Sequence, residues 1–201
     1  SVWGMLWLVS RNAQWKTLDQ FKGQEIAMPF RADMPDILFQ LLARQQGLDP
    51  GRDFKLRYVA SPLEAMQLLI TRRVDHALLA EPAISMALRK TQSFPVSVVA
   101  PQLYRSVNLQ QEWARVFQRA PEIAQAGVAA VGALRQDAAL LRQVRAALAE
   151  AHAWCWANPK ACGEMASRYA PMLQADAVAD SLLATPAVWR SARDAQQRIC
   201  D

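Results

Sequence analysis

The feature that most constrains the fold is an alternation of short apolar runs with amphipathic helical patterns over the first 100 residues. Strand-like runs fall at residues 1–10, 25–29, 54–59, 74–79 and 94–100, and helical patterns stand between them at 33–46, after 61 and at 81–90. Strands that alternate with helices of roughly 10–15 residues indicate βαβ units and a largely parallel sheet. The sequence therefore predicts an α/β fold.

The predicted helices carry start and stop signals of their own. Asp33 precedes the first pattern as an N-cap, and Gly47 follows it where a left-handed C-terminal cap is expected. Ser61, Pro62 and Glu64 have the spacing of a capping box with proline at the first helical position. These signals place helix N-termini directly after predicted strands.

The pattern changes after Pro101. A helix is expected at 108–119 and a last strand at 127–131, and from Asp137 onward the pattern is almost wholly helical. Pro159 begins a new helix, and further helices are expected at 174–184 and 186–199. One continuous apolar stripe is formed by Leu141, Val144, Leu148, Ala151 and Cys155.

Composition and charge exclude several classes of protein. Hydrophobic residues make up 52% and charged residues 20%, an ordinary globular composition. No apolar run approaches the ~20 residues of a membrane helix, and residues 2–9 lack the flanks of a signal peptide, so any leader is expected outside this sequence. The net charge is +5, but basic residues are scattered, so nucleic acid is not an expected partner. The basic balance favours an anionic ligand only weakly.

The cysteines and histidines indicate neither a metal site nor a nucleophile. Cys155, Cys162 and Cys200 form no CxxC pair, and His76 and His152 have no ligand spacing. Burial of Cys155 is the favoured interpretation, and a Cys155–Cys162 disulfide is the alternative.

Motifs for catalysis are also absent from the sequence. It contains no GxSxG, HExxH or glycine-rich phosphate loop. Asp33 and Asp36 lie within one helical turn, as acids that complement the helix dipole do. We therefore expect no enzyme, no catalytic residue, no cofactor and no metal.

Three loops could form a binding site. In open α/β sheets, ligands bind beyond the carboxyl ends of the strands, where helix N-termini favour anionic groups. Here those loops are residues 29–33, 60–62 and 80–82, and their three helices should point at one edge. Arg31 could clamp an anion there with two hydrogen bonds, and we prefer this interpretation to a solvated loop charge.

The other loop residues have a structural explanation beside the functional one. Asp33 and Ser61 could contact a ligand, but capping explains both sufficiently. Phe30 could stack on a ring or simply pack. Glu81 follows an apolar strand, where a carboxylate needs a partner. It could bind a ligand amine or hydroxyl, or it could pair with Arg31, and neither option is preferred.

Several motifs carry a family resemblance by their order and spacing. They are "TLDQFKGQEIAMPF", then "GLDPGRD", "SPLEA", "VDHALLAEP" and, near the end of the chain, "AHAWCWANPKAC". Over about residues 15–170 this series resembles the nitrate/sulfonate/taurine/thiamine-precursor group of solute-binding proteins. The stretch 30–33 departs from that family, whose members often carry a Gly-Ser or Ser-Thr pair there. This departure puts a hydroxyl-rich oxyanion pocket in question.

The resemblance implies a type II periplasmic-binding fold with two α/β lobes that close by a hinge. Family members carry a further segment before the strand at residues 1–10, so the first lobe is expected to be incomplete. Residues 1–14 would be a crossover strand from lobe one, 15–132 lobe two, and 133–201 a mainly helical return to lobe one. The ligand-facing positions implied by the family are Phe30, Arg31, Ala32, Asp33, Ser61 and Glu81.

The function that this resemblance implies is the substrate-binding component of an ABC-type importer. It would capture a small solute between the lobes and deliver it to a permease in the membrane. The protein is expected in the periplasm, a lipid anchor is left open, and the complete protein is expected to be a monomer. The alternative is the effector-sensing domain of a transcription regulator, which has the same fold. An enzyme on this scaffold, a thiamine-precursor synthase, would need a cysteine- and histidine-rich iron site, which the sequence lacks.

Overall fold

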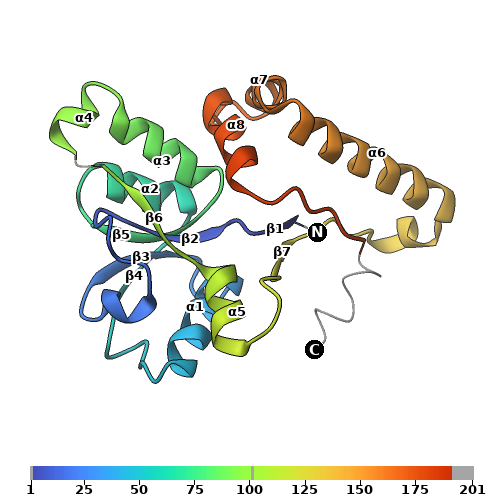
Figure 1. Cartoon of the computed structure of the whole chain (residues 1–201). Coiled ribbons are helices and arrows are strands. Elements are labelled where there is room, and N and C mark those ends of the chain that lie inside the picture. Colours follow the sequence, from blue (N-terminus) through green and yellow to red (C-terminus); the bar gives the residue numbers. More distant parts are fainter. Residues whose placement is uncertain (1, 101, 192–201) are drawn as a thin grey trace. The chain divides into compact units, whose positions relative to one another are not determined.

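The chain divides into two compact units in a computed structural model that describes residues 2–100 and 102–191 (Figure 1). Gly4–Ile123 form one unit, called here the sheet unit. Ser1–Trp3 and Ala124–Asp201 form the other, called here the helical unit. Among the described residues, none of the helices has the length and hydropathy of a membrane span.

A five-stranded sheet organises the sheet unit, in the order β4-β3-β5-β2-β6. Its strands are β2 (Leu6–Ser10), β3 (Glu25–Pro29), β4 (Lys55–Val59), β5 (His76–Ala80) and β6 (Tyr104–Asn108). β3 runs parallel to β4 and β5, whereas β2 runs antiparallel to both of its neighbours, β5 and β6. The prediction of an α/β fold with a parallel-rich sheet is thus confirmed, with β2 as the reversed strand.

Helices cover both faces of this sheet (Figure 1). The helices of the unit are η1 (Leu18–Phe21), α1 (Met34–Gln45), α2 (Pro62–Ile70), α3 (Ala83–Gln92), α4 (Val96–Val99) and α5 (Leu109–Phe117). α2 and α3 pack on one face, and α1 and α5 on the other. The main apolar core lies on the α1 and α5 side, where Phe21, Ile26, Met28, Phe39 and Leu42 are fully buried. Burial of this size is the dominant favourable term in folding.

The start and stop signals in the sequence work as predicted. The carboxylate of Asp33 accepts a 2.7 Å hydrogen bond from the Met34 N–H at the start of α1. The Ser61 hydroxyl accepts one of 3.2 Å from the Glu64 N–H in the first turn of α2. Gly47 follows α1 with φ +76°, a conformation that costs other residues energy.

Two strand predictions in the first 100 residues are wrong. The strand expected at 1–10 is divided, over its described residues 2–10, into β1 (Val2–Trp3) and β2, and Gly4, with φ +80°, lies between them. The run 94–100 contains the helical turn α4 instead of a strand, and Val98 and Val99 are exposed. The edge strand that pairs with β2 is β6, not the run 94–100. The sequence of β6 is partly polar, so it contains no apolar run that could have been detected.

The helical unit contains only a two-stranded ladder in its described part. β1 pairs antiparallel with β7 (Ala124–Ala126). The helices are η2 (Gly132–Gln136), α6 (Ala138–Ala157), α7 (Pro159–Tyr169) and α8 (Ala175–Ala184). The strand expected at 127–131 is wrong, since no residue there joins a ladder. The helix expected at 186–199 is also wrong over 186–191, and 192–199 lie outside the described residues.

A disulfide joins α6 to α7. Cys155 and Cys162 are bonded, with their Cα atoms 5.1 Å apart. The favoured interpretation of Cys155 as a buried free thiol is therefore wrong, and the alternative holds. The reason is the break at Asn158 and Pro159, which ends one helix and starts the next so that the two side chains meet.

α7 and α8 pack closely at a glycine. A Cβ atom added to Gly163 would lie 2.1 Å from the carbonyl oxygen of Ala175, so only glycine fits there. The buried residues of these two helices are all small apart from one valine: Gly163, Ala177, Val178, Ala179 and Ser181.

The apolar stripe on α6 lines a groove rather than a closed core. No residue of α6 is buried. A groove of about 750 Å³ within the helical unit is lined by residues 124–130, by α6 side chains that include Leu141, Val144 and Leu148, and by residues 189–191. The periodicity was sufficient to find the helix, but not to show what covers its apolar face.

Candidate functional site

The carboxyl ends of β4, β3 and β5 lie side by side at one edge of the sheet, called here the carboxyl edge. Pro29 at the end of β3 is in register with Val59 at the end of β4, and β5 lies on the other side of β3. The three loops expected to form a site begin there and lead into α1, α2 and α3. Because parallel strands end at the same edge, all six predicted site residues lie along it.

The loop between β3 and α1 presents two exposed side chains. Phe30 is 43% exposed, and Arg31 beside it is also exposed. The guanidinium carbon of Arg31 lies 5.1 Å from the centroid of the Tyr58 ring, within range of a cation–π contact. Among the described residues Arg31 has no carboxylate partner, so its N–H groups can donate hydrogen bonds to an acceptor from outside the chain.

Asp33 and Ser61 cap helices in the structure, which confirms the capping role expected for both. Glu64 adds a further internal acceptor, since its carboxylate takes a 2.9 Å hydrogen bond from the Ala60 N–H. The N-terminal donors of α1 and α2 are thus partly occupied by side chains of the chain itself. These caps compete with an anionic ligand for the N–H groups at the two helix N-termini. The side chain of Arg31 is therefore the group at this edge that is available to pair with an anion.

Glu81 is held inside the sheet unit by its own partners. Its side chain is 1% exposed and accepts hydrogen bonds from Ser85 Oγ at 2.8 Å and Arg105 Nε at 3.1 Å. The suggested pairing with Arg31 is therefore wrong, since the partner is Arg105 on β6. A buried carboxylate is stable only when it is paired and hydrogen-bonded, as here. Arg105 could not be anticipated, because β6 itself was missed.

Two further residues of the carboxyl edge acquire a role only in the structure. Asp36, which the sequence indicated as a dipole-stabilising acid, is buried and accepts hydrogen bonds from the Ala32 N–H at 2.8 Å and the Tyr58 hydroxyl at 3.0 Å. Tyr58 is the last residue but one of β4, a strand with period-two alternation, and that alternation is the signal that could have placed it near this edge.

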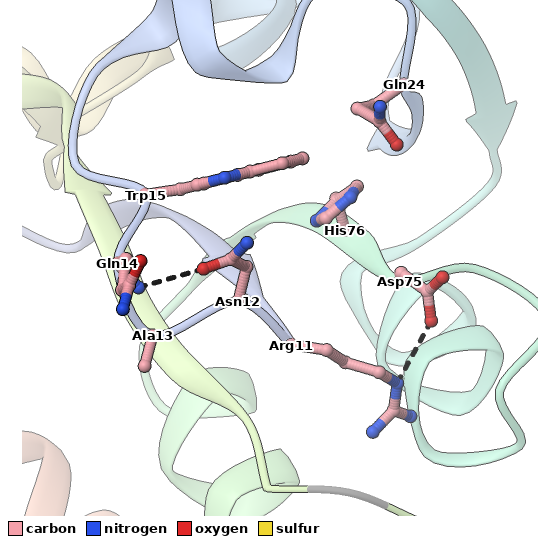
Figure 2. Close-up of a pocket in the computed structure, with 8 residues that line it drawn as sticks. All are labelled: Arg11, Asn12, Ala13, Gln14, Trp15, Gln24, Asp75 and His76. Carbon is pink, nitrogen blue, oxygen red and sulfur yellow. Dashed lines mark hydrogen bonds and ion pairs between the residues drawn. The ribbon is translucent and has the colours of Figure 1, made fainter.

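A depression lies at the opposite edge of the sheet, at the amino ends of β3 and β5 (Figure 2). Its volume is about 640 Å³, and it is lined by Arg11, Asn12, Ala13, Gln14, Trp15, Gln24, Asp75 and His76. The ring of Trp15 stacks on His76 with centroids 5.1 Å apart, and Arg11 pairs with Asp75 at 3.3 Å. The sequence did not indicate this depression.

His76 has a structural role in that depression. Its Nδ1 lies 2.9 Å from the hydroxyl of Ser10, which is fully buried and so cannot meet a substrate. Burial lowers the pKa of His76, and the nearby Arg11 lowers it further while Asp75 opposes the shift. Within the described ranges, no group of histidine, cysteine and acidic side chains could hold a metal ion.

Comparison with solved structures identifies the fold. The chain is similar to the periplasmic aliphatic sulphonate binding protein SsuA from Escherichia coli, with a TM-score of 0.66 and 20% identity. It is also similar to an ABC transporter protein from Parabacteroides distasonis (TM-score 0.70, 21% identity). A third similar structure is the alkanesulfonate-binding protein SsuA from Xanthomonas axonopodis pv. citri bound to MOPS (TM-score 0.53, 17% identity).

These matches cover 98%, 98% and 96% of this chain, but 57%, 62% and 61% of the other three chains. The chain therefore spans about three fifths of the length of these structures. No protein-family model matches the sequence, and no curated protein matches it. The type II periplasmic-binding fold that the sequence resemblance implied is confirmed.

Proposed function

We propose that this chain, which has the type II periplasmic-binding fold, is the solute-binding component of an ABC-type importer. It binds a small solute with an anionic group at the carboxyl edge. The observation that carries the proposal is Arg31, an exposed cation at that edge without a carboxylate partner among the described residues. Support comes from the fold, which the chain shares with proteins described as sulfonate-binding.

The six residues of the proposed site divide by role. Arg31 pairs with the anionic group, and the exposed ring of Phe30 contacts the apolar part of the solute. The small side chain of Ala32 leaves room beside them. Asp33, Ser61 and Glu81 act through their caps and ion pair, which fix the starts of α1, α2 and α3.

The remaining parts of the proposal concern the whole protein. The sheet unit corresponds to lobe two, predicted at residues 15–132, and the helical unit to part of lobe one. The protein is exported to the periplasm, where a Cys155–Cys162 disulfide persists, and it delivers solute to a membrane permease. It does so without enzymatic activity or a cofactor, and it acts as a monomer when complete.

A thermal-shift screen tests the proposal. The panel contains nitrate, alkanesulfonates, aromatic carboxylates and, as largely uncharged compounds, pyrimidines. At a hundredfold excess over its dissociation constant, a true ligand stabilises the protein by about 2.7 kcal/mol. We expect an anion of the panel to do so, and Arg31→Ala to reduce the stabilisation to about 1.4 kcal/mol or less at the same anion concentration.

The matched control is Lys55→Ala, which removes an exposed cation from the opposite end of the neighbouring strand β4. We expect it to leave the stabilisation unchanged. Binding that is confined to pyrimidines would contradict the class of solute, and binding that Arg31→Ala leaves unchanged would contradict the proposed site.

A further inference from the structure

The loop that carries Arg31 has an unusual backbone. Phe30 and Ala32, on either side of Arg31, have φ angles of +57° and +62°. Residues other than glycine rarely adopt this left-handed conformation, and each such residue costs on the order of 1 kcal/mol. Such a conformation persists only where surrounding contacts impose it, and it concentrates at functional sites.

The contacts that impose it come from Asp36. One carboxylate oxygen accepts a hydrogen bond from the Ala32 N–H at 2.8 Å, which ties the loop to the first turn of α1. The other accepts the Tyr58 hydroxyl at 3.0 Å and the Gln40 side-chain amide at 2.8 Å. With 1% of its surface exposed and three donors, Asp36 links the loop, α1 and β4 in one network. Hydrogen bonds to a buried charged group are the strong ones.

Tyr58 connects this network to Arg31. Its hydroxyl donates to Asp36 while its ring lies 5.1 Å below the guanidinium carbon of Arg31. Burial and the hydrogen bond to Asp36 raise the pKa of Tyr58, so its hydroxyl stays protonated and remains a donor. A ring contacts the face of a guanidinium group and leaves the N–H groups at its edge available to another acceptor.

The arginine that binds Glu81 shows the contrast. Arg105 donates to the Glu81 carboxylate from Nε at 3.1 Å and to Ser85 Oγ from Nη2 at 2.9 Å, so these two nitrogens already have acceptors within the chain. Arg31 is oriented by an aromatic ring instead, which supplies no competing acceptor.

We propose that Asp36 and Tyr58 are positioning residues, which hold Arg31 over the carboxyl edge so that its N–H edge receives the anionic group of the solute. This inference rests on the proposed function. Neither Asp36 nor Tyr58 touches the solute. Both reduce the side-chain and loop freedom that Arg31 would otherwise lose on binding, which is the usual effect of preorganisation.

A double-mutant cycle tests the proposal, with each anion of the panel above as the probe. Arg31→Ala is expected to weaken binding about 10- to 100-fold, the loss of a charged hydrogen bond. Tyr58→Leu removes the ring and is expected to weaken binding about 3- to 10-fold. Tyr58→Phe keeps the ring and is expected to stay within about threefold of wild type.

The decisive readout is the dependence on Arg31. In an Arg31→Ala background, Tyr58→Leu and Asp36→Asn are expected to have no further effect on the dissociation constant, because they act through Arg31. A purely structural role would weaken binding equally in both backgrounds, and that result would overturn the proposal. Tyr104→Leu, which removes a half-buried tyrosine from β6, is the control.

A second measurement needs no ligand. In NMR spectra, the Tyr58 ring should shift the Arg31 Hε resonance in wild type and in Tyr58→Phe, but not in Tyr58→Leu. A resonance that Tyr58→Leu leaves in place would overturn the positioning role even if no anion binds. Absence of anion binding together with the expected shifts would instead contradict the proposed function.

Discussion

The sheet unit and the helical unit are stabilised in different ways. The largest fully buried side chains among the described residues, such as Phe39 and Leu78, all belong to the sheet unit. In the helical unit, α6 has no buried residue, α7 and α8 pack through small side chains, and one disulfide joins α6 to α7. The sheet unit is therefore stabilised mainly by apolar burial, and the described part of the helical unit mainly by local links.

Truncation of the sheet-unit core should have the largest effect. Phe39 is fully buried on α1, with its ring 5.2 Å from that of Phe54. Phe39→Ala is expected to lower the free energy of unfolding by about 3–5 kcal/mol, because it removes buried apolar area and leaves a cavity. Chemical denaturation measures this, with the exposed Ile37→Ala on the same helix as control. Equal losses of unfolding free energy in the two variants would contradict the conclusion that apolar burial stabilises the sheet unit.

A buried amide comes next in expected effect. The side-chain oxygen of Gln110 accepts the N–H groups of Gly4 at 2.8 Å and Ile123 at 3.2 Å, the first and last residues of the sheet unit. Gln110→Leu leaves two donors without this acceptor and should destabilise by about 2–4 kcal/mol. Gln110→Glu keeps an acceptor and should cost less, as should the exposed Gln111→Leu, all measured by urea denaturation.

Removal of the disulfide tests whether the helical unit is stabilised by local links. Cys155 and Cys162 are seven residues apart, and loss of a cross-link over so short a loop costs about 2.5 kcal/mol. The double change to serine should increase hydrogen exchange in α6 and α7 while exchange in the sheet unit stays unchanged. Reduced wild-type protein should behave like the double variant. A loss of protection spread over both units would show that they are not independently stabilised.

Acid should have the smallest effect. His76 has a lowered pKa because of burial, so the unfolded chain takes up a proton before the folded one as pH falls. The stability from neutral His76 is complete above the ordinary pKa near 6.5 and is lost as pH falls through the lowered value. Denaturation at pH 7.5 and 5.5 should show a smaller pH dependence for His76→Gln than for wild type. An unchanged dependence would contradict this.

Much of the fold could be predicted because its signals are local. Asp33, Ser61 and Gly47 mark helix ends through hydrogen bonds and backbone angles within a few residues. β6 could not be predicted, because its burial comes from pairing with β2, distant in sequence. The run at 94–100 was apolar enough for a strand but had no strand to pair with.

The candidate site shows the same division. Parallel strands followed by capped helices were enough to place Phe30, Arg31 and Ser61 at one edge. The partners of Glu81 and Arg31 could not be read from the sequence, since Arg105 and Tyr58 lie on other strands. Side-chain pairing across strands depends on register and on sheet order, neither of which leaves a local signal.

By itself, the sequence determined the α/β class, the capped starts of α1 and α2 and the three loops at the carboxyl edge, because these follow from periodicity and capping over short distances. Only the tertiary structure decided which charges are paired. It assigned Glu81 to Arg105 and left Arg31 on the ring of Tyr58. The reason is that electrostatic pairing depends on distances between residues far apart in the chain, and folding alone sets those distances.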